Sequence, residues 1–186
     1  MRRMILFNMI TLDGFFAGPQ GEIDWHNVDA EFNDFAIEQL DSMDILLFGR
    51  VTYAWMAGYW PTQIAIQNDS VVAGKMNVKS KVVFSKTLDK ADWNNTRLIK
   101  KDIDWEISKL KGQPGKDLII FGSGNLAVDL ANLGLIDEYR LMLNPVVLGK
   151  GRGLFEGIDG KLKLKLIKTR EFRSGNVLLH YRPSGK

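Results

Sequence analysis

The segment Asp117-Leu-Ile-Ile-Phe-Gly-Ser-Gly-Asn-Leu-Ala127 joins a short apolar run to a glycine pair and the start of a helical pattern. The run 117–121 is typical of a buried strand, and the pattern from Asn125 to about Leu133 predicts a helix that ends at Gly134. The first N–H groups of such a helix, together with the positive end of its dipole, face whatever lies beyond the strand. Because glycine has no Cβ, a phosphate can approach this turn closely. The segment therefore predicts an anion-binding strand–turn–helix unit, with a glycine turn that binds no ligand as the alternative.

The spacing Gly122-x-Gly124-x-x-Ala127 also matches the fingerprint of the Rossmann dinucleotide fold. That fingerprint belongs to the first βαβ unit of its fold, and an acidic residue follows at the end of the next strand. Here the motif comes late in the chain, and Asp137 and Glu138 stand at the beginning of the next predicted strand. Too few residues remain for a second mononucleotide-binding half, so we reject the Rossmann interpretation.

Two other segments repeat the same arrangement. The apolar run Ile45-Leu-Leu-Phe48 leads through Gly49 into a helix start that carries Arg50 and Thr52. In Val82-Val-Phe-Ser-Lys-Thr87, an apolar strand is followed directly by a hydroxyl, a cation and a second hydroxyl. Taken singly, a serine or threonine after a strand is usually a turn or cap residue. Ligands of open α/β sheets bind at the carboxyl ends of the strands, however. Three such strand ends in one small protein predict a dinucleotide that carries several phosphates.

The rest of the chain completes an α/β pattern. Strands are expected over 4–12 and 96–100, a loop over 15–21, helices from Asp29 and over 103–110, and further extended segments over 137–147, 162–172 and 176–182. Strands alternate with helices to about residue 135, which predicts a mostly parallel central sheet with helices on both faces. The last strands follow one another without helices, which predicts an antiparallel C-terminal part. We expect one domain over 1–182 and a short tail over 183–186.

Composition excludes several classes of protein. The chain has 186 residues, 45% of them hydrophobic and 25% charged, with 25 basic and 22 acidic residues and a net charge of +3. It has no cysteine and only two histidines, so neither disulfides nor a metal site are expected. The charge balance argues against nucleic acid as a partner. The apolar run at the N-terminus is broken by Asn8, Thr11 and Asp13, so we expect no signal peptide, no membrane partner and a cytoplasmic location.

Lysines alternate with leucines in Lys161-Leu-Lys-Leu-Lys-Leu-Ile-Lys168. With a period of two, Lys161, Lys163 and Lys165 share one face of a strand, and the leucines share the other. We interpret this pattern as a solvated or protected edge strand, because lysines commonly protect sheet edges. A phosphate-binding patch is the alternative.

The order of the three strand ends resembles the dihydrofolate reductase-like family. The resemblance is closest to the branch that contains the reductase domain of bifunctional riboflavin biosynthesis proteins. It rests on Thr11-Leu-Asp-Gly14, Phe48-Gly-Arg-Val-Thr-Tyr53, Phe84-Ser-Lys-Thr87, Phe121-Gly-Ser-Gly-Asn-Leu126, Ile136-Asp-Glu-Tyr-Arg140 and Asn144-Pro-Val-Val-Leu-Gly149. The similarity covers essentially the whole chain and depends on the order and spacing of these motifs, since no single one is specific.

The resemblance implies an NADPH-dependent reductase that transfers hydride to a small heterocycle such as a pteridine, a pyrimidine or a flavin precursor. The cofactor contacts that carry over are Gly49, Arg50, Thr52, Ser85, Lys86, Gly122, Ser123, Gly124, Asn125 and Leu126. The segment 14–21 would form a flap over the nicotinamide. A protein of the same fold that binds a dinucleotide or a pterin without catalysis is the alternative.

Two carboxylates are candidates for a catalytic role. Asp13 stands at the end of the first strand, where it could bond a substrate or fix the flap, with an ordinary Asp-Gly turn as the alternative. Asp29 stands at the expected start of the first helix, where capping is the simpler interpretation.

We also expect a homodimer. Its sheets would pair through the late strands, which carry Leu141, Leu143, Leu164 and Leu166. Related riboflavin-pathway domains pair in this way, so this expectation belongs to the resemblance.

Overall fold

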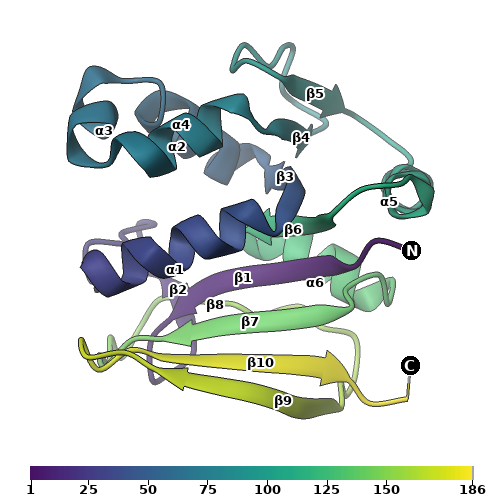
Figure 1. Cartoon of the computed structure of the whole chain (residues 1–186). Coiled ribbons are helices and arrows are strands. Elements are labelled where there is room, and N and C mark those ends of the chain that lie inside the picture. Colours follow the sequence, from purple (N-terminus) through teal and green to yellow (C-terminus); the bar gives the residue numbers. More distant parts are fainter. Residues whose placement is uncertain (186) are drawn as a thin grey trace.

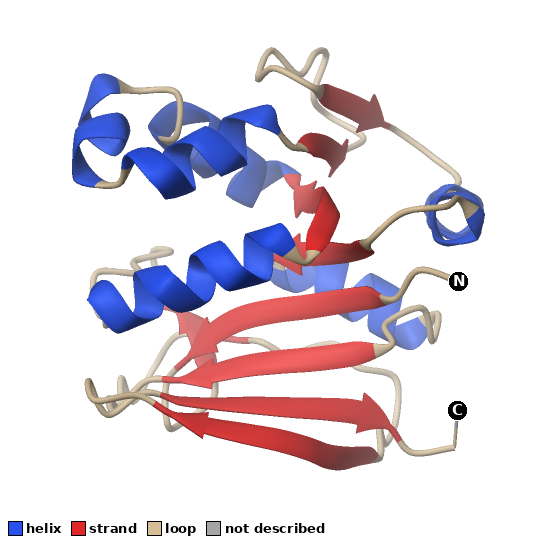
Figure 2. Ribbon diagram, viewed as in Figure 1, coloured by secondary structure: helices blue, strands red, loops and turns tan. Residues whose placement is uncertain are grey.

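The computed structural model describes residues 1–185, which form an eight-stranded sheet with helices on both faces (Figures 1 and 2). The strand order is β5-β4-β3-β6-β1-β7-β10-β9. The strands are β1 (Met4–Ile10), β3 (Met43–Gly49), β4 (Ser80–Phe84), β5 (Thr96–Ile99), β6 (Asp117–Phe121), β7 (Glu138–Leu143), β9 (Leu164–Glu171) and β10 (Val177–Pro183). Neighbours from β5 to β7 pair in parallel, whereas β10 is antiparallel to both β7 and β9. The predicted sheet is confirmed.

The helices divide between the two faces of the sheet. They are α1 (Ala30–Asp41), α2 (Arg50–Tyr59), α3 (Gln63–Asn68), α4 (Ser70–Val78), α5 (Ile103–Gly112) and α6 (Gly124–Asn132). Alternate residues of β1 show why both faces are covered: Ile5 and Phe7 pack in one core with α1, α2 and α4, and Leu6 packs in the other with α5 and α6. This is the two-sided burial expected of a parallel sheet. Within residues 1–185, no helix is both long enough and apolar enough to cross a membrane.

Four elements were not expected from the sequence. A second sheet pairs β2 (Phe15–Ala17) with β8 (Arg152–Gly153), so the segment predicted as a loop begins with a strand. Its partner is remote in the chain, which local patterns cannot indicate. The helices α3 and α4 also escaped prediction, because apolar residues of α4 lie on its exposed side as well as its buried side.

The edge position expected for the lysine-rich strand is confirmed, since β9 is the last strand of the sheet. The predicted alternation, with lysines on one face of the strand and leucines on the other, is only partly correct. Leu164 packs toward the core, but a bulge opposite His180 and Tyr181 shifts the register, so that Leu166 and Ile167 are each 48% exposed.

The C-terminal end of the chain is tied to this edge. Pro183 still belongs to β10, and the backbone N–H of Ser184 donates to the carbonyl of Lys163. Residues 183 and 184 of the expected tail thus continue the sheet, whereas Lys186 lies outside the described residues.

Candidate functional site

The carboxyl ends of β4, β3 and β6 lie side by side and form what we call the carboxyl edge of the sheet, as distinct from its outermost strands β5 and β9. In the parallel register Gly49 is opposite Phe84, and Leu47 is opposite Ile120. The turns that follow these strands begin at Ser85, Arg50 and Gly122. The structure thus brings together the three segments that the sequence indicated.

Two helices that start at this edge, α2 and α6, have no side-chain cap at their N-termini within the described chain. Gly49 and Ser123 occupy the N-cap positions of α2 and α6, and no side chain from residues 1–185 caps either helix. Asp29, Thr62 and Asp69 cap α1, α3 and α4 with their side chains, whereas α5, among the described residues, lacks a side-chain cap as α2 and α6 do. Uncapped first turns leave backbone donors available, which is the arrangement that binds anions.

The hydroxyls of Ser123 and Thr52 bond across the site instead of pointing into it. The Oγ of Ser123 accepts from the backbone N–H of Gly49 at 2.8 Å, and the backbone N–H of Ser123 donates to Oγ1 of Thr52 at 3.0 Å. Ser123 is only 8% exposed. The sequence predicted Ser123 and Thr52 as cofactor contacts, and in the structure their hydroxyls make hydrogen bonds within the protein.

The glycine turn is tightly surrounded. Gly122 adopts φ +58°, and a Cβ there would lie 3.3 Å from the side chain of Thr52. A Cβ on Gly124 would lie 2.6 Å from the ring of Phe16, so the flap strand β2 rests on the first residue of α6. Asn125 is exposed beside this contact, whereas the side chain of Leu126 is buried in the core. Leu126 can therefore offer a ligand only its backbone.

Exposed cations lie at the carboxyl edge beside the ends of β3 and β4. Arg50 and Lys86 are exposed at the turns after β3 and β4. The Oγ of Ser85 accepts from the backbone N–H groups of Thr87 and Leu88 at 3.2 and 3.0 Å, so it orders its own turn.

Two further lysines that were not predicted as site residues lie at this edge. The backbone N–H of Ser85 donates to the carbonyl of Ile99, which places Lys100 and Lys101 beside the turn that carries Lys86. A weak strand followed by a charged pair was the signal that could have revealed them.

Asp13 joins two loops at the same edge. Thr11 Oγ1 donates to its carboxylate at 2.6 Å, and the backbone N–H groups of Leu148 and Gly149 donate at 3.2 and 2.7 Å. The hydrogen bond from Thr11, helped by those from the two amides, lowers the pKa of Asp13. The carboxylate therefore ties the turn after β1 to the loop after β7.

Asp29 caps α1 as expected, since its Oδ1 accepts from the backbone N–H of Phe32 at 2.8 Å. Its neighbour His26 is more buried than the loop position suggested, and burial lowers the pKa of its imidazole to about 4. No described atom bonds the Nε2 of His26 or the Nε1 of Trp25. The catalytic roles of Asp13 and Asp29 stay predictions.

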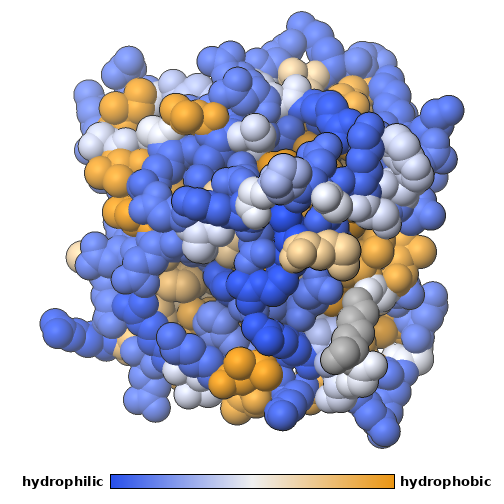
Figure 3. Space-filling model, turned by 45° about the vertical axis from the view of Figure 1, so that its right-hand side comes forward, coloured by the Kyte–Doolittle hydropathy of each residue, from blue (hydrophilic) through white to orange (hydrophobic). Residues whose placement is uncertain are grey.

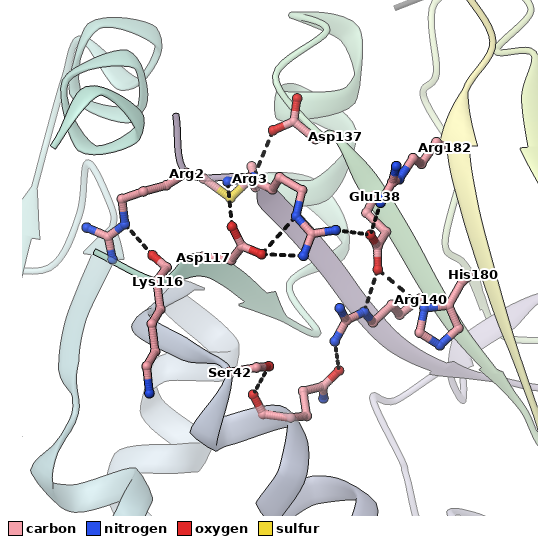
Figure 4. A network of polar contacts seen from close by, with 12 residues as sticks. Arg2, Arg3, Ser42, Lys116, Asp117, Asp137, Glu138, Arg140, His180 and Arg182 are labelled. Carbon is pink, nitrogen blue, oxygen red and sulfur yellow. Dashed lines mark hydrogen bonds and ion pairs between the residues drawn. The ribbon is translucent and has the colours of Figure 1, made fainter. Parts of the chain in front are cut away.

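The densest charge cluster lies at the opposite edge of the sheet (Figure 4). Glu138, at the start of β7, accepts from Arg3, Arg140 and Arg182, and its carboxylate contacts Nδ1 of His180. This cluster joins the beginnings of β1 and β7 to the C-terminal part of β10 and is remote from the glycine turns. The described residues contain no group of three or more potential metal-ligating side chains.

Two cavities, of about 520 and 710 Å³, meet at Trp93. The larger one lies between α2 and the loop after β4, and the smaller one lies beside the starts of β4 and β5. Neither is lined by the glycine turns, over which Phe16 is packed.

Comparison with known proteins identifies this architecture. The model of the RibD C-terminal domain matches residues 2–178. The chain belongs to the RibD C-terminal domain family. The protein YyaP of Bacillus subtilis (strain 168) is 38% identical over 186 residues, which cover 99% of this chain and 96% of that one.

Solved structures of similar fold agree with this architecture. A putative riboflavin biosynthesis protein from Shewanella sp. PV-4 superposes with a TM-score of 0.75 at 23% identity, over 98% of this chain and 99% of its own. Dihydrofolate reductase from Enterococcus faecalis, solved with NADP(H), superposes with a TM-score of 0.66 at 14% identity, over 98% and 96% of the two chains. These matches establish that this RibD C-terminal domain protein has the dihydrofolate reductase-like fold.

Proposed function

We propose that this RibD C-terminal domain protein is an NADPH-dependent reductase that transfers hydride to a small heterocycle, such as a pteridine, a pyrimidine or a flavin precursor. One observation carries the proposal. Two helices with uncapped N-termini start side by side at the carboxyl edge of the sheet, and exposed cations border them. A dinucleotide with several phosphates is the ligand class that fits such an edge.

The residues at this edge suit the cofactor in different ways. The amides of the first turns of α2 and α6 would hold the diphosphate, and Gly122 lets it approach because no Cβ intervenes. Lys86 would neutralise the phosphate on the adenosine ribose. NADPH, when bound, supplies the hydride, while the protein orients the reactants and excludes water. The flap that carries Phe16 covers this end of the site, which suits the exclusion of water.

A direct experiment tests the proposal. Purified protein is titrated with NADPH by quenching of tryptophan fluorescence, and NADPH oxidation is then followed at 340 nm with a panel of pterins, dihydrofolate and pyrimidines. We expect NADPH to bind and at least one heterocycle to be reduced. Absence of NADPH binding would contradict the proposal.

The second candidate is a protein of the same fold that binds a dinucleotide or a pterin without catalysis. It is favoured by the contacts of the two carboxylates considered for proton transfer. Asp13 accepts three hydrogen bonds and has a lowered pKa, and Asp29 caps α1. NADPH binding without oxidation by any heterocycle of the panel would support this candidate.

A further inference from the structure

We propose that Ser123 and Thr52 form a brace that holds the first turns of α2 and α6 together without capping the backbone N–H groups of either helix. The inference rests on the proposed function, because it concerns how the same site is kept ready for NADPH. Both residues then act as positioning residues and not as direct contacts of the cofactor.

The brace is a closed set of hydrogen bonds between two helix starts. Ser123 Oγ accepts from the N–H of Gly49 at 2.8 Å and donates to the carbonyl of Phe121 at 3.2 Å. The N–H of Ser123 donates to Oγ1 of Thr52, the third residue of α2, at 3.0 Å. Each helix start is thus bonded to the other through one side-chain hydroxyl.

The serine at this N-cap position behaves unusually. A serine there ordinarily accepts from the second or third backbone N–H of its own helix. Ser123 instead bonds the N–H of Gly49, the N-cap residue of α2, and makes no cap bond to its own helix within the described chain. Because the hydroxyl is used across the site, the first-turn amides of α6 stay available. The same holds for α2, whose N-cap residue Gly49 has no side chain.

The backbone conformation of Ser123 indicates that its surroundings hold it in place. Ser123 has φ +61°, a left-handed conformation that is unfavourable for a residue with a Cβ. Such a conformation persists where the surroundings determine it. Glycines provide the close approach: a Cβ on Gly49 would lie 3.4 Å from Cβ of Ser123, and one on Gly122 would lie 3.3 Å from Cγ2 of Thr52.

The function follows from the geometry. A diphosphate that spans both helix starts is bound well only if the two sets of amides keep a fixed separation. Since Ser123 is 8% exposed and its hydroxyl is bonded twice within the protein, it acts through the backbone it holds. Loss of either hydroxyl should therefore let the two helix starts move apart.

A double-mutant cycle tests the brace. NADPH affinity is measured by fluorescence quenching for the wild type, Ser123→Ala, Thr52→Val and the double variant. We expect each single variant to bind about fivefold to tenfold more weakly, as for the loss of one hydrogen bond. The double variant should bind no more weakly than the worse single variant, because the two hydroxyls act as one unit. Thr52→Ser keeps the hydroxyl and should bind as the wild type does.

The control is Ser108→Ala, which removes an exposed hydroxyl from α5 and should leave the affinity unchanged. Losses that multiply in the double variant would indicate two separate contacts with the cofactor and would overturn the brace. So would unchanged affinity in both single variants.

A second measurement separates this inference from the proposed function. Thr52→Val should speed hydrogen exchange at the backbone amide of Ser123 by at least about tenfold, because that amide loses its acceptor. If the wild type does not bind NADPH, the proposed function fails, and the exchange rate still tests the brace. An unchanged exchange rate would overturn it.

Discussion

Lys86 is the residue at which cofactor choice is most directly testable. It is exposed in the turn after β4, next to the loop that carries Lys100 and Lys101. Lys86→Ala should weaken NADPH binding by about tenfold, the effect of losing one charge-assisted hydrogen bond at a solvated site. NADH, which lacks the 2′-phosphate, should bind nearly as before. The loss should shrink in high salt, because exposed charges are screened.

The measurement for Lys86 is a fluorescence titration with both cofactors at two salt concentrations. Lys165→Ala, on the far edge strand β9, is the matched control. Equal losses for NADPH and NADH would show that Lys86 does not recognise the 2′-phosphate. Ser85, which we first grouped with Lys86, should contribute less, since its hydroxyl accepts from the amides of Thr87 and Leu88.

Glu138 is the residue whose titration should show in the stability of the whole protein. Burial alone would raise the pKa of this carboxyl, but hydrogen bonds from His180 and Arg140 and the charges of Arg140 and Arg3 lower it to about 2. The ionised form therefore stabilises the fold above pH 4.5, and this contribution of about 3 kcal/mol is lost as the pH falls from 4.5 toward 2. Glu138→Gln should be less stable at neutral pH and show a flatter decline in this window.

Thermal melting between pH 7 and pH 2.5 checks the prediction for Glu138. Glu171→Gln, an exposed carboxyl on β9, should leave the pH dependence unchanged. If the melting temperatures of the wild type and Glu138→Gln fell by the same amount over this pH range, the prediction would be wrong.

At the level of elements, the sequence predicted those strands and turns whose residue pattern is set by their own neighbours in the chain. The apolar runs of β3 and β6 and the glycines after them were visible, because a buried parallel strand must be apolar throughout. The pairing of β2 with β8 was not visible, since it depends on a contact between remote segments. In the site, the sequence indicated which turns meet. It could not show that the hydroxyl of Ser123 accepts from the N–H of Gly49, or that the hydroxyl of Thr52 accepts from the N–H of Ser123, because both bonds depend on the approach of two helices.

The contact between the flap and α6 changes what a substitution at Gly124 should do. From the sequence alone, Gly124→Val should weaken NADPH binding and leave the fold intact. The structure places the ring of Phe16 where the new Cβ would lie, so we expect a loss of stability of about 1–3 kcal/mol as well. Gly124→Ala should show both effects to a smaller extent.

A second substitution separates the two effects. In Phe16→Ala/Gly124→Ala the clash is removed, so the melting temperature should be no lower than that of Phe16→Ala alone. NADPH affinity, measured by fluorescence quenching, should stay low, because the Cβ still blocks the phosphate. Recovery of both would mean that Gly124 serves only the packing of the flap.

At the scale of the molecule, the two edges of the sheet have different chemistry. The carboxyl edge of the parallel strands carries glycine turns and uncapped helices, whereas the opposite edge carries the arginine and carboxylate cluster around Glu138 (Figure 4). Charges at the second edge are paired and tie the beginnings of β1 and β7 to the C-terminal part of β10, whereas Arg50 and Lys86 at the first edge are exposed. The paired charges around Glu138 and the groups proposed to bind the cofactor thus lie at opposite edges of the sheet.

The last prediction from the sequence is a homodimer, and the structure changes which residues could form its interface. Of the four leucines proposed for a dimer interface, Leu141 is 6% exposed within the core and Leu164 packs inward, so neither can meet a partner. Leu143 is partly buried against the cluster of Ile10, Leu141 and Leu154. Leu166 is the most exposed of the four, and both it and the neighbouring Ile167 are 48% exposed on the edge strand β9. On the face seen in Figure 3, apolar residues form separate small patches among polar ones. An interface would therefore have to combine such residues with backbone pairing of the edge.

We propose that two copies pair through β9, whose free edge can continue the sheet. Light scattering at micromolar concentration should give the mass of a dimer. Leu166→Lys together with Ile167→Lys should shift it toward the monomer, because two charges would be buried against the partner. Val78→Lys, at a residue of α4 that is 75% exposed, is the matched control and should leave the dimer intact. A monomeric wild type would contradict the proposal, and a dimer that survives both lysines would place the interface elsewhere than on β9.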